Sequence, residues 1–125
     1  MAVLDASAIL ALLNNEPGAS MVAGTLNGAR ISAVNLAEVA AKLADYGMAQ
    51  SDIETVLGNL SLRVQPLEEA DAFASAALRQ STRPAGLSLG DRCCLALGQA
   101  LSDNVLTADR AWARLGLKIT ITPIR

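Results

Sequence analysis

Three acidic residues stand at junctions where they could share one chemical task. Asp5 closes the first apolar run of the chain, and Asp109 follows another apolar run near its end. Asp91 lies in the first turn of a helical pattern that begins at Ser88. Carboxylate oxygens are the ligands that hard divalent cations prefer. If these side chains converge in space, we expect them to form a divalent-metal site.

The absence of histidine narrows the chemistry further. None occurs in 125 residues, which removes Ser-His-Asp and Cys-His nucleophile systems and every histidine general base. Catalysis would have to run on carboxylates, hydroxyls, lysine or arginine. The only cysteines, Cys93 and Cys94, are neighbours on one predicted helix, which does not indicate a disulfide between them. We interpret them as buried small side chains rather than zinc ligands.

Composition limits the class of protein and its partners. Residues 1–125 fit a single domain, with 52% hydrophobic residues to build one core. The apolar runs are shorter than a membrane span, and the N-terminus lacks the basic flank of a secretory signal, so we expect a cytoplasmic protein with no membrane partner. With a net charge of −2 and one Phe, one Tyr and one Trp, a nucleic acid would have to be held by bound metal and local arginines.

Strand and helix patterns alternate along the chain. Strands are expected at 2–4, 62–67, 105–107 and 118–122, and a turn plus a very short strand at 28–32. Helices are expected at 8–13, 20–27, 34–46, 51–59, 68–80, 88–102 and 109–115, with a loop at 82–86. This alternation predicts an α/β fold with a mainly parallel sheet of about five strands and helices on both faces.

Helix 34–46 carries a clear amphipathic pattern. Ser32 can cap its start and Gly47 can end it, and Ser51 can cap the next helix. The apolar stripe consists of Leu36, Val39, Ala40 and Leu43, and the opposite polar stripe of Asn35, Glu38, Lys42 and Asp45. The pattern does not distinguish a polar stripe that faces solvent from one that faces an active-site cleft.

Two interpretations of the aspartates are open. In a parallel sheet, ligands bind beyond the carboxyl ends of the strands, where Asp5 and Asp109 are expected, and Asp91 begins the helix that leads into the strand before Asp109. Helix capping explains each residue taken singly, and Ser88-x-x-Asp91 resembles a capping box. The metal-site interpretation is strengthened because all three aspartates occur at comparable junctions between structural elements.

Glu38 has a similar ambiguity, because Lys42 four residues later could form an exposed ion pair with it on the helix surface. The pattern leaves a structural role and a functional role evenly balanced.

Several polar residues accompany the acids. Ser7, Thr107 and Asn35 could orient carboxylates or metal-bound water, and local capping is the simpler role for the two hydroxyls. Arg92 and Arg110 each follow a proposed ligand directly, where they could bind phosphate or balance the acids.

Four segments together resemble the motifs of PIN-domain proteins, and in particular of the VapC-type toxins of prokaryotic toxin–antitoxin pairs. The segments are Val-Leu-Asp-Ala-Ser-Ala at 3–8, Asn-Leu-Ala-Glu-Val at 35–39, Leu-Ser-Leu-Gly-Asp-Arg-Cys-Cys-Leu-Ala-Leu at 87–97 and Leu-Thr-Ala-Asp-Arg-Ala-Trp at 106–112. The resemblance spans essentially the whole chain. Each motif is weak alone, but four acids in this order with these neighbours form a fairly specific signal.

The resemblance implies a metal-dependent endoribonuclease with a three-layer α/β/α sandwich. Asp5, Glu38, Asp91 and Asp109 match the family's acidic quartet, and Thr107 matches the hydroxyl residue beside the last acid. One or two Mg²⁺ or Mn²⁺ ions would lower the pKa of an attacking water and stabilise charge on the phosphate, leaving a 5′-phosphate and a 3′-hydroxyl on the RNA. A homodimer and an antitoxin whose tail covers the groove are also implied.

One position departs from the family pattern. Gly90 stands where many relatives have alanine, and we expect it to loosen the start of its helix without removing a ligand.

Other functions fit the sequence less well. A phosphoacceptor receiver domain needs an acidic pair after its first strand and an aspartate after a middle strand, but Asp5 is followed by Ala6 and no aspartate lies at 62–67. A haloacid-dehalogenase-type phosphatase needs Asp-x-Asp, and the third position here is Ser7. A catalytically silent PIN-like binding protein is the remaining alternative, and the complete set of four acids argues against it.

Overall fold

Five short strands form one sheet in the order β3-β2-β1-β4-β5, and every neighbouring pair is parallel. The computed structural model describes every residue, Met1–Arg125. The strands are β1 (Ala2–Leu4), β2 (Arg30–Ser32), β3 (Arg63–Gln65), β4 (Asn104–Thr107) and β5 (Ile121–Pro123). The prediction of a parallel sheet of about five strands is confirmed.

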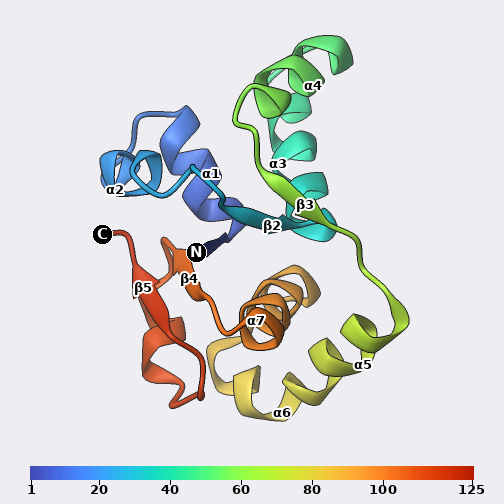
Figure 1. Cartoon of the computed structure of the whole chain (residues 1–125), viewed down its shortest axis with the longest axis vertical. Helices are drawn as coiled ribbons and strands as arrows, with labels where there is room; N and C mark the ends of the chain where they lie inside the picture. Colours follow the sequence, from blue (N-terminus) through green and yellow to red (C-terminus); the bar gives the residue numbers. More distant parts are fainter.

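Helices cover both faces of this sheet, as Figure 1 shows. One face carries α1 (Ala6–Leu13), α2 (Ala19–Ala23), α3 (Ala33–Asp45) and α4 (Gln50–Gly58). The other face carries α5 (Glu69–Ala77), α6 (Arg79–Thr82), α7 (Leu89–Leu101) and the 3₁₀ turns η1 (Arg83–Ala85) and η2 (Arg110–Arg114). The predicted three-layer α/β/α sandwich is therefore confirmed. None of these helices is both long enough and apolar enough to span a bilayer.

The two central strands are buried on both sides. Leu4 and Leu106 pack into the core beneath α1 to α4, whereas Val3 and Val105 pack into the core beneath α5 to α7. The second core also holds the single tryptophan, Trp112, which is 1% exposed. Alternating side chains of a strand point to opposite faces, so strands that read as continuous apolar runs serve both cores.

The predicted boundaries between 68 and 86 are wrong. The helix expected at 68–80 is two helices, because α5 ends at Ala77 and α6 begins at Arg79, and the loop expected from 82 holds η1. Leu78, at the break, is buried in the second core, and the Thr82 hydroxyl donates to its carbonyl oxygen at 2.7 Å. Tertiary packing and this local hydrogen bond thus override the helical pattern.

Caps account for another correction. Ser32 caps α3 as predicted and accepts a hydrogen bond from the N–H of Val34 at 3.2 Å. Ser51 does not cap α4, because that helix begins earlier, with Ala49 at the N-cap. The helix at 20–27 and the strands at 62–67 and 118–122 are each shorter than expected. Pro66 follows β3 directly and lacks the N–H that a longer strand would need.

Gly98 sets how closely α7 packs on the sheet. A Cβ atom at this position would lie 2.3 Å from Cγ2 of Val105, a fully buried residue of β4. The branched valine side chain has little freedom to move away in a packed core.

We therefore expect Gly98→Ala to destabilise the protein. Overpacking typically costs about 1–3 kcal/mol, and the better helix propensity of alanine offsets at most about 1 kcal/mol of it. Urea denaturation measures the effect. Gly58→Ala is the matched control, because a Cβ there meets nothing within 4 Å and the variant should be equally or more stable than the wild type. Equal stabilities of the two variants would contradict the close packing of α7.

Candidate functional site

Asp5 lies at the carboxyl edge of the sheet, directly after β1, and is 5% exposed. Its backbone N–H donates to the carbonyl oxygen of Leu106 in β4 at 3.0 Å, which fixes it between the two central strands. Asp5 occupies the N-cap position of α1, yet its side chain accepts no capping hydrogen bond. For this carboxylate the capping interpretation is wrong.

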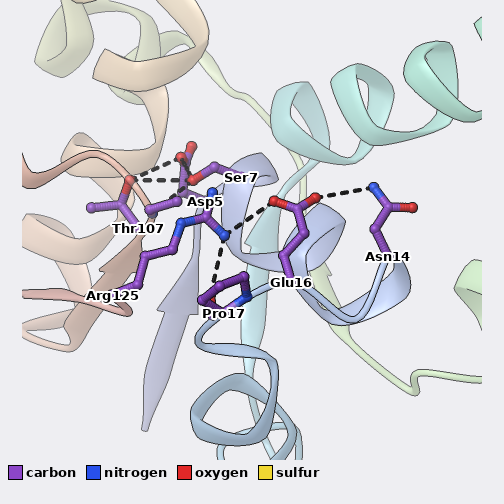
Figure 2. Close-up of polar contacts among 8 residues, drawn as sticks. Asp5, Ser7, Asn14, Glu16, Pro17, Thr107 and Arg125 are labelled. Carbon is purple, nitrogen blue, oxygen red and sulfur yellow. Dashed lines mark hydrogen bonds and ion pairs between the residues drawn. The ribbon is translucent and has the colours of Figure 1, made fainter.

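Two hydroxyl groups hold the Asp5 carboxylate through a single oxygen (Figure 2). The Ser7 hydroxyl donates to Oδ2 at 2.5 Å and the Thr107 hydroxyl donates to the same oxygen at 3.1 Å. Backbone N–H groups of Ala108 and Asp109 donate to these two hydroxyl oxygens, at 2.9 and 3.1 Å. The hydroxyl protons are thus directed at Oδ2, and no side chain donates to Oδ1; the backbone N–H of Ser7 also helps to lower the pKa of this carboxylate.

Asp91 lies in the first turn of α7 and forms the expected capping box. The Ser88 hydroxyl oxygen accepts from the N–H of Asp91 at 3.2 Å, and Asp91 Oδ2 accepts from the N–H of Ser88 at 2.9 Å. The capping interpretation is correct here. It uses only one of the two carboxylate oxygens.

Asp109 caps the turn η2 in the same partial way. Its Oδ1 accepts from the N–H of Ala111 at 2.9 Å, and no hydrogen bond reaches Oδ2. Asp109 is exposed, and its N–H is bonded to the Thr107 hydroxyl that also contacts Asp5. The two acids therefore sit at one junction.

Glu38 extends from α3 toward the start of α7. Its Oε1 accepts from the amide Nδ2 of Asn35 at 2.7 Å, and that amide also donates to the carbonyl oxygen of Gly90 at 3.0 Å. The alternative ion pair with Lys42 does not form, and the Lys42 ammonium lies 5.8 Å from the centre of the Tyr46 ring instead. Asn35 is fully buried although it belongs to the polar stripe.

All four acids share one feature: each is fixed through one oxygen, and no side chain donates a hydrogen bond to the other. The fixed oxygens are Asp5 Oδ2, Glu38 Oε1, Asp91 Oδ2 and Asp109 Oδ1. Capping and ligand binding are thus compatible roles for one carboxylate. A free, oriented oxygen on each acid is the form that a cation ligand takes.

Two groups have a raised pKa that reflects the negative charge of these acids. Burial raises the pKa of Asp5 to about 6, and the negative charge of Asp91 raises it further against the opposing effect of the Ser7 hydrogen bond. Burial also raises the pKa of the fully buried Cys94 thiol, with added contributions from the charges of Asp5, Asp91 and Glu38. The charges of acidic residues from β1, α3 and α7 therefore all act on this buried thiol.

The acids are neighbours without being in chelating contact. No group of three or more Asp, Glu, Cys or His side chains lies close enough together to hold a metal ion. Binding an ion would therefore require the free oxygens to move toward each other.

The nearby arginines do not neutralise these carboxylates. Arg92 Nη1 donates to the carbonyl oxygen of Ser75 in α5 at 3.1 Å, and Arg110 Nε donates to the carbonyl oxygen of Arg125 at 2.7 Å. Figure 2 shows the Arg125 guanidinium directed at Glu16 and Pro17, with an ion pair of 3.1 Å to Glu16. None of the three ion pairs involves the four acids. An oxygen-rich site without a protein cation fits Mg²⁺ or Mn²⁺.

The sequence patterns missed two features of the site. The first is the effect of the acidic residues on the pKa of the buried Cys94 thiol, which no sequence pattern indicates. The second is Gly90, where a Cβ atom would lie 2.4 Å from Oε1 of Glu38. The effect of Gly90 on the stability of the helix start stays a prediction, and α7 begins at Leu89 with a complete capping box. The sign of this in the sequence was that glycine stands where many relatives have alanine. In the structure, the glycine leaves space for the Glu38 carboxylate.

The largest hollow of the molecule, about 540 Å³, lies elsewhere, between α3, α4 and β3. Its lining is mainly apolar and includes none of the four acids. It therefore does not belong to the acidic site.

Comparisons with known proteins agree on the fold. The family profile of the PIN domain matches residues 2–118. No curated protein sequence matches the chain. Among solved structures, a toxin–antitoxin complex from Klebsiella pneumoniae contains a chain with a TM-score of 0.78 and 21% identity, with 100% of this chain and 98% of that chain covered.

Two further structures are similar over almost their whole length. A chain of VapBC2 from Rickettsia felis, bound to a DNA fragment from its promoter, gives a TM-score of 0.75 at 15% identity and covers 98% and 97% of the two chains. A chain of FitAcB from Neisseria gonorrhoeae gives 0.72 at 20% identity and covers 99% and 98%. These likenesses establish the fold.

The raised pKa of Asp5 predicts a pH-dependent cost to stability. Because the folded-state value of about 6 exceeds the ordinary value of 3.8, stability falls as the pH rises through this window. A shift of about two units corresponds to about 3 kcal/mol. Asp5→Asn should therefore raise the free energy of unfolding by up to about 3 kcal/mol at pH 7.5 and leave it nearly unchanged at pH 4. Urea denaturation at both pH values tests this, and a variant no more stable than the wild type at pH 7.5 would contradict it.

Proposed function

Because the chain belongs to the PIN domain family, we propose that it is a divalent-metal-dependent endoribonuclease and the toxin of a toxin–antitoxin pair. The observation that carries the proposal is the set of four acids, each fixed through one oxygen with the other free. In a chain without histidine, such a set is the available means of cleaving a phosphodiester bond.

The toxin assignment has a separate support. The similar structure from Klebsiella pneumoniae is described as a toxin–antitoxin complex, and the two others as VapBC2 and FitAcB. We infer by similarity that this chain also acts in the cytoplasm, forms a homodimer and binds an antitoxin that blocks its acidic edge. RNA is the proposed substrate.

The ion would be held by the free oxygens of the quartet. Asp5 Oδ1 and Asp91 Oδ1 would be the central ligands, since the charge of Asp91 contributes to the raised pKa of Asp5, and Asp109 Oδ2 and Glu38 Oε2 would complete the set. A bound Mg²⁺ or Mn²⁺ ion supplies charge stabilisation for the phosphate and activates water.

The chain's own residues contribute orientation and exclusion of water. Ser7 and Thr107 prevent the Asp5 carboxylate from rotating, and its burial keeps bulk water from this side of the site. Glu38 is exposed, so its free oxygen can orient the water that attacks the phosphate. The capping bonds of Asp91 and Asp109 join the site to the starts of α7 and η2.

We expect the purified protein to cleave RNA with Mg²⁺ or Mn²⁺ and to stop when a chelator is added. Asp91→Asn should lower the rate by about 100-fold or more, because the ion's contribution to charge stabilisation is several kcal/mol. The amide oxygen of Asn can still accept from Ser88, so the variant should remain folded. Structured and unstructured RNA are incubated in parallel, and products should carry a 5′-phosphate and a 3′-hydroxyl.

The matched control is Asp45→Asn, which removes the same charge from an exposed residue of α3. It should cleave at the wild-type rate. Cleavage that persists in chelator, or full activity of Asp91→Asn, would refute the mechanism. No cleavage of any RNA by a correctly folded wild-type protein would favour the silent binding protein.

Expression in a bacterial host tests the toxin assignment. The wild-type chain should arrest growth, Asp91→Asn should not, and co-expression of a small protein encoded beside the gene should restore growth. Normal growth with active wild-type nuclease present would separate the enzymatic activity from a toxin role.

A further inference from the structure

We propose that Asn35 is a positioning residue for Glu38, and that Gly90 provides the space in which Asn35 holds it. The two residues fix the Glu38 carboxylate against the first turn of α7 before any cation binds. This inference rests on the proposed function, because Glu38 needs a fixed position only if the acidic quartet binds an ion.

The hydrogen bonds of the Asn35 amide determine its orientation. Nδ2 donates to Glu38 Oε1 at 2.7 Å and to the Gly90 carbonyl oxygen at 3.0 Å, so both amide protons are used. Rotating the amide by 180° would place Oδ1 against two acceptors. Oδ1 itself is buried and has no partner. A buried acceptor without a partner lowers the stability of the fold. The Asn35 amide therefore makes its two hydrogen bonds at a cost in stability.

Gly90 makes the same contact possible from the side of α7. A Cβ atom there would lie 2.4 Å from Glu38 Oε1 and 2.7 Å from Oε2. The three atoms nearest to that position all belong to the end of the Glu38 side chain, and the glycine has an ordinary helical conformation. Alanine would therefore fit the backbone and would displace only the end of the Glu38 side chain.

The consequence of this contact is a preset distance between two acids. Glu38 belongs to α3 and Asp91 to α7, and the carbonyl that Asn35 bonds belongs to the residue just before Asp91. Without the amide, repulsion from neighbouring carboxylates would turn an exposed, flexible glutamate toward water. Fixing Oε1 keeps Oε2 available beside Asp91, which reduces the reorganisation needed when an ion binds.

Titration of Mn²⁺ into the full-length protein, followed by electron paramagnetic resonance of the free ion, tests the proposal without RNA. Asn35→Leu keeps the branching of the side chain and removes both donors. We expect it to bind Mn²⁺ about 10- to 100-fold more weakly, as for other residues that support a metal ligand. Its melting temperature should not fall, because the unpaired Oδ1 is removed as well.

Gly90→Ala provides a second, independent variant. It should weaken Mn²⁺ binding in the same way while its melting temperature stays equal or rises, since alanine favours the helix. This variant carries the test if Asn35→Leu does not fold.

A double-variant comparison separates positioning from packing. In a Glu38→Gln background, Asn35→Leu should cause no further loss of Mn²⁺ affinity if Asn35 acts through Glu38. The same fold-loss in both backgrounds would overturn the proposal, as would wild-type affinity in both Asn35→Leu and Gly90→Ala. A folded wild-type protein that binds no Mn²⁺ would overturn the proposed function and this inference with it.

Discussion

Repulsion among gathered carboxylates is the constraint on which the acidic edge depends. Asp5 is buried, and Asp91 carries the same charge nearby, so the arrangement opposes ionisation of Asp5. The molecule tolerates this because each acid is tied to the fold through one oxygen. Ser7 and Thr107 tie Asp5, and backbone N–H groups tie Asp91 and Asp109. The same bonds that stabilise helix starts thus hold the negative charge in place.

The strand order explains why these residues meet. The chain leaves β1 toward β2 and β3 and later returns to β4 on the other side of β1, so the direction of progression reverses between β1 and β4. Crevices for ligands open at such reversals, outside the carboxyl ends of the strands. Asp5 follows β1 and Asp109 follows β4, on opposite sides of this point. Helices α3 and α7 then bring Glu38 and Asp91 from the two covering layers toward the same edge.

The sequence was sufficient for the architecture and for the positions of the acids in the chain. Apolar runs separated by amphipathic segments specify a parallel sheet with helices on both faces, and Ser32 and Ser88 mark two helix starts correctly. The prediction that Ser51 caps α4 is wrong because a serine inside the first turn of a helix gives the same sequence pattern as a serine just before the helix. The break at Leu78 depends on burial in the second core, which no local pattern reveals.

The site was less predictable than the fold, because its details depend on contacts between distant segments. Periodicity places Asn35 and Lys42 on one polar stripe, yet Asn35 is fully buried against α7 and Lys42 is exposed. Only the approach of α7 distinguishes them. Gly90 shows the same limit. The glycine is visible in the sequence, but the side chain that occupies the space beside it is that of Glu38, more than fifty positions away in the chain.

Cys94 gives the acidic edge a chemical consequence beyond ion binding. A thiol reacts with peroxide only as the thiolate, and oxidation to sulfenic acid follows thiolate character and access. Cys94 has no exposed surface. Its burial, and in addition the charges of nearby carboxylates, oppose loss of its proton. Burial first, and the negative charges of Asp5, Asp91 and Glu38 in addition, therefore keep this thiol protonated and protect the sulfur from oxidation.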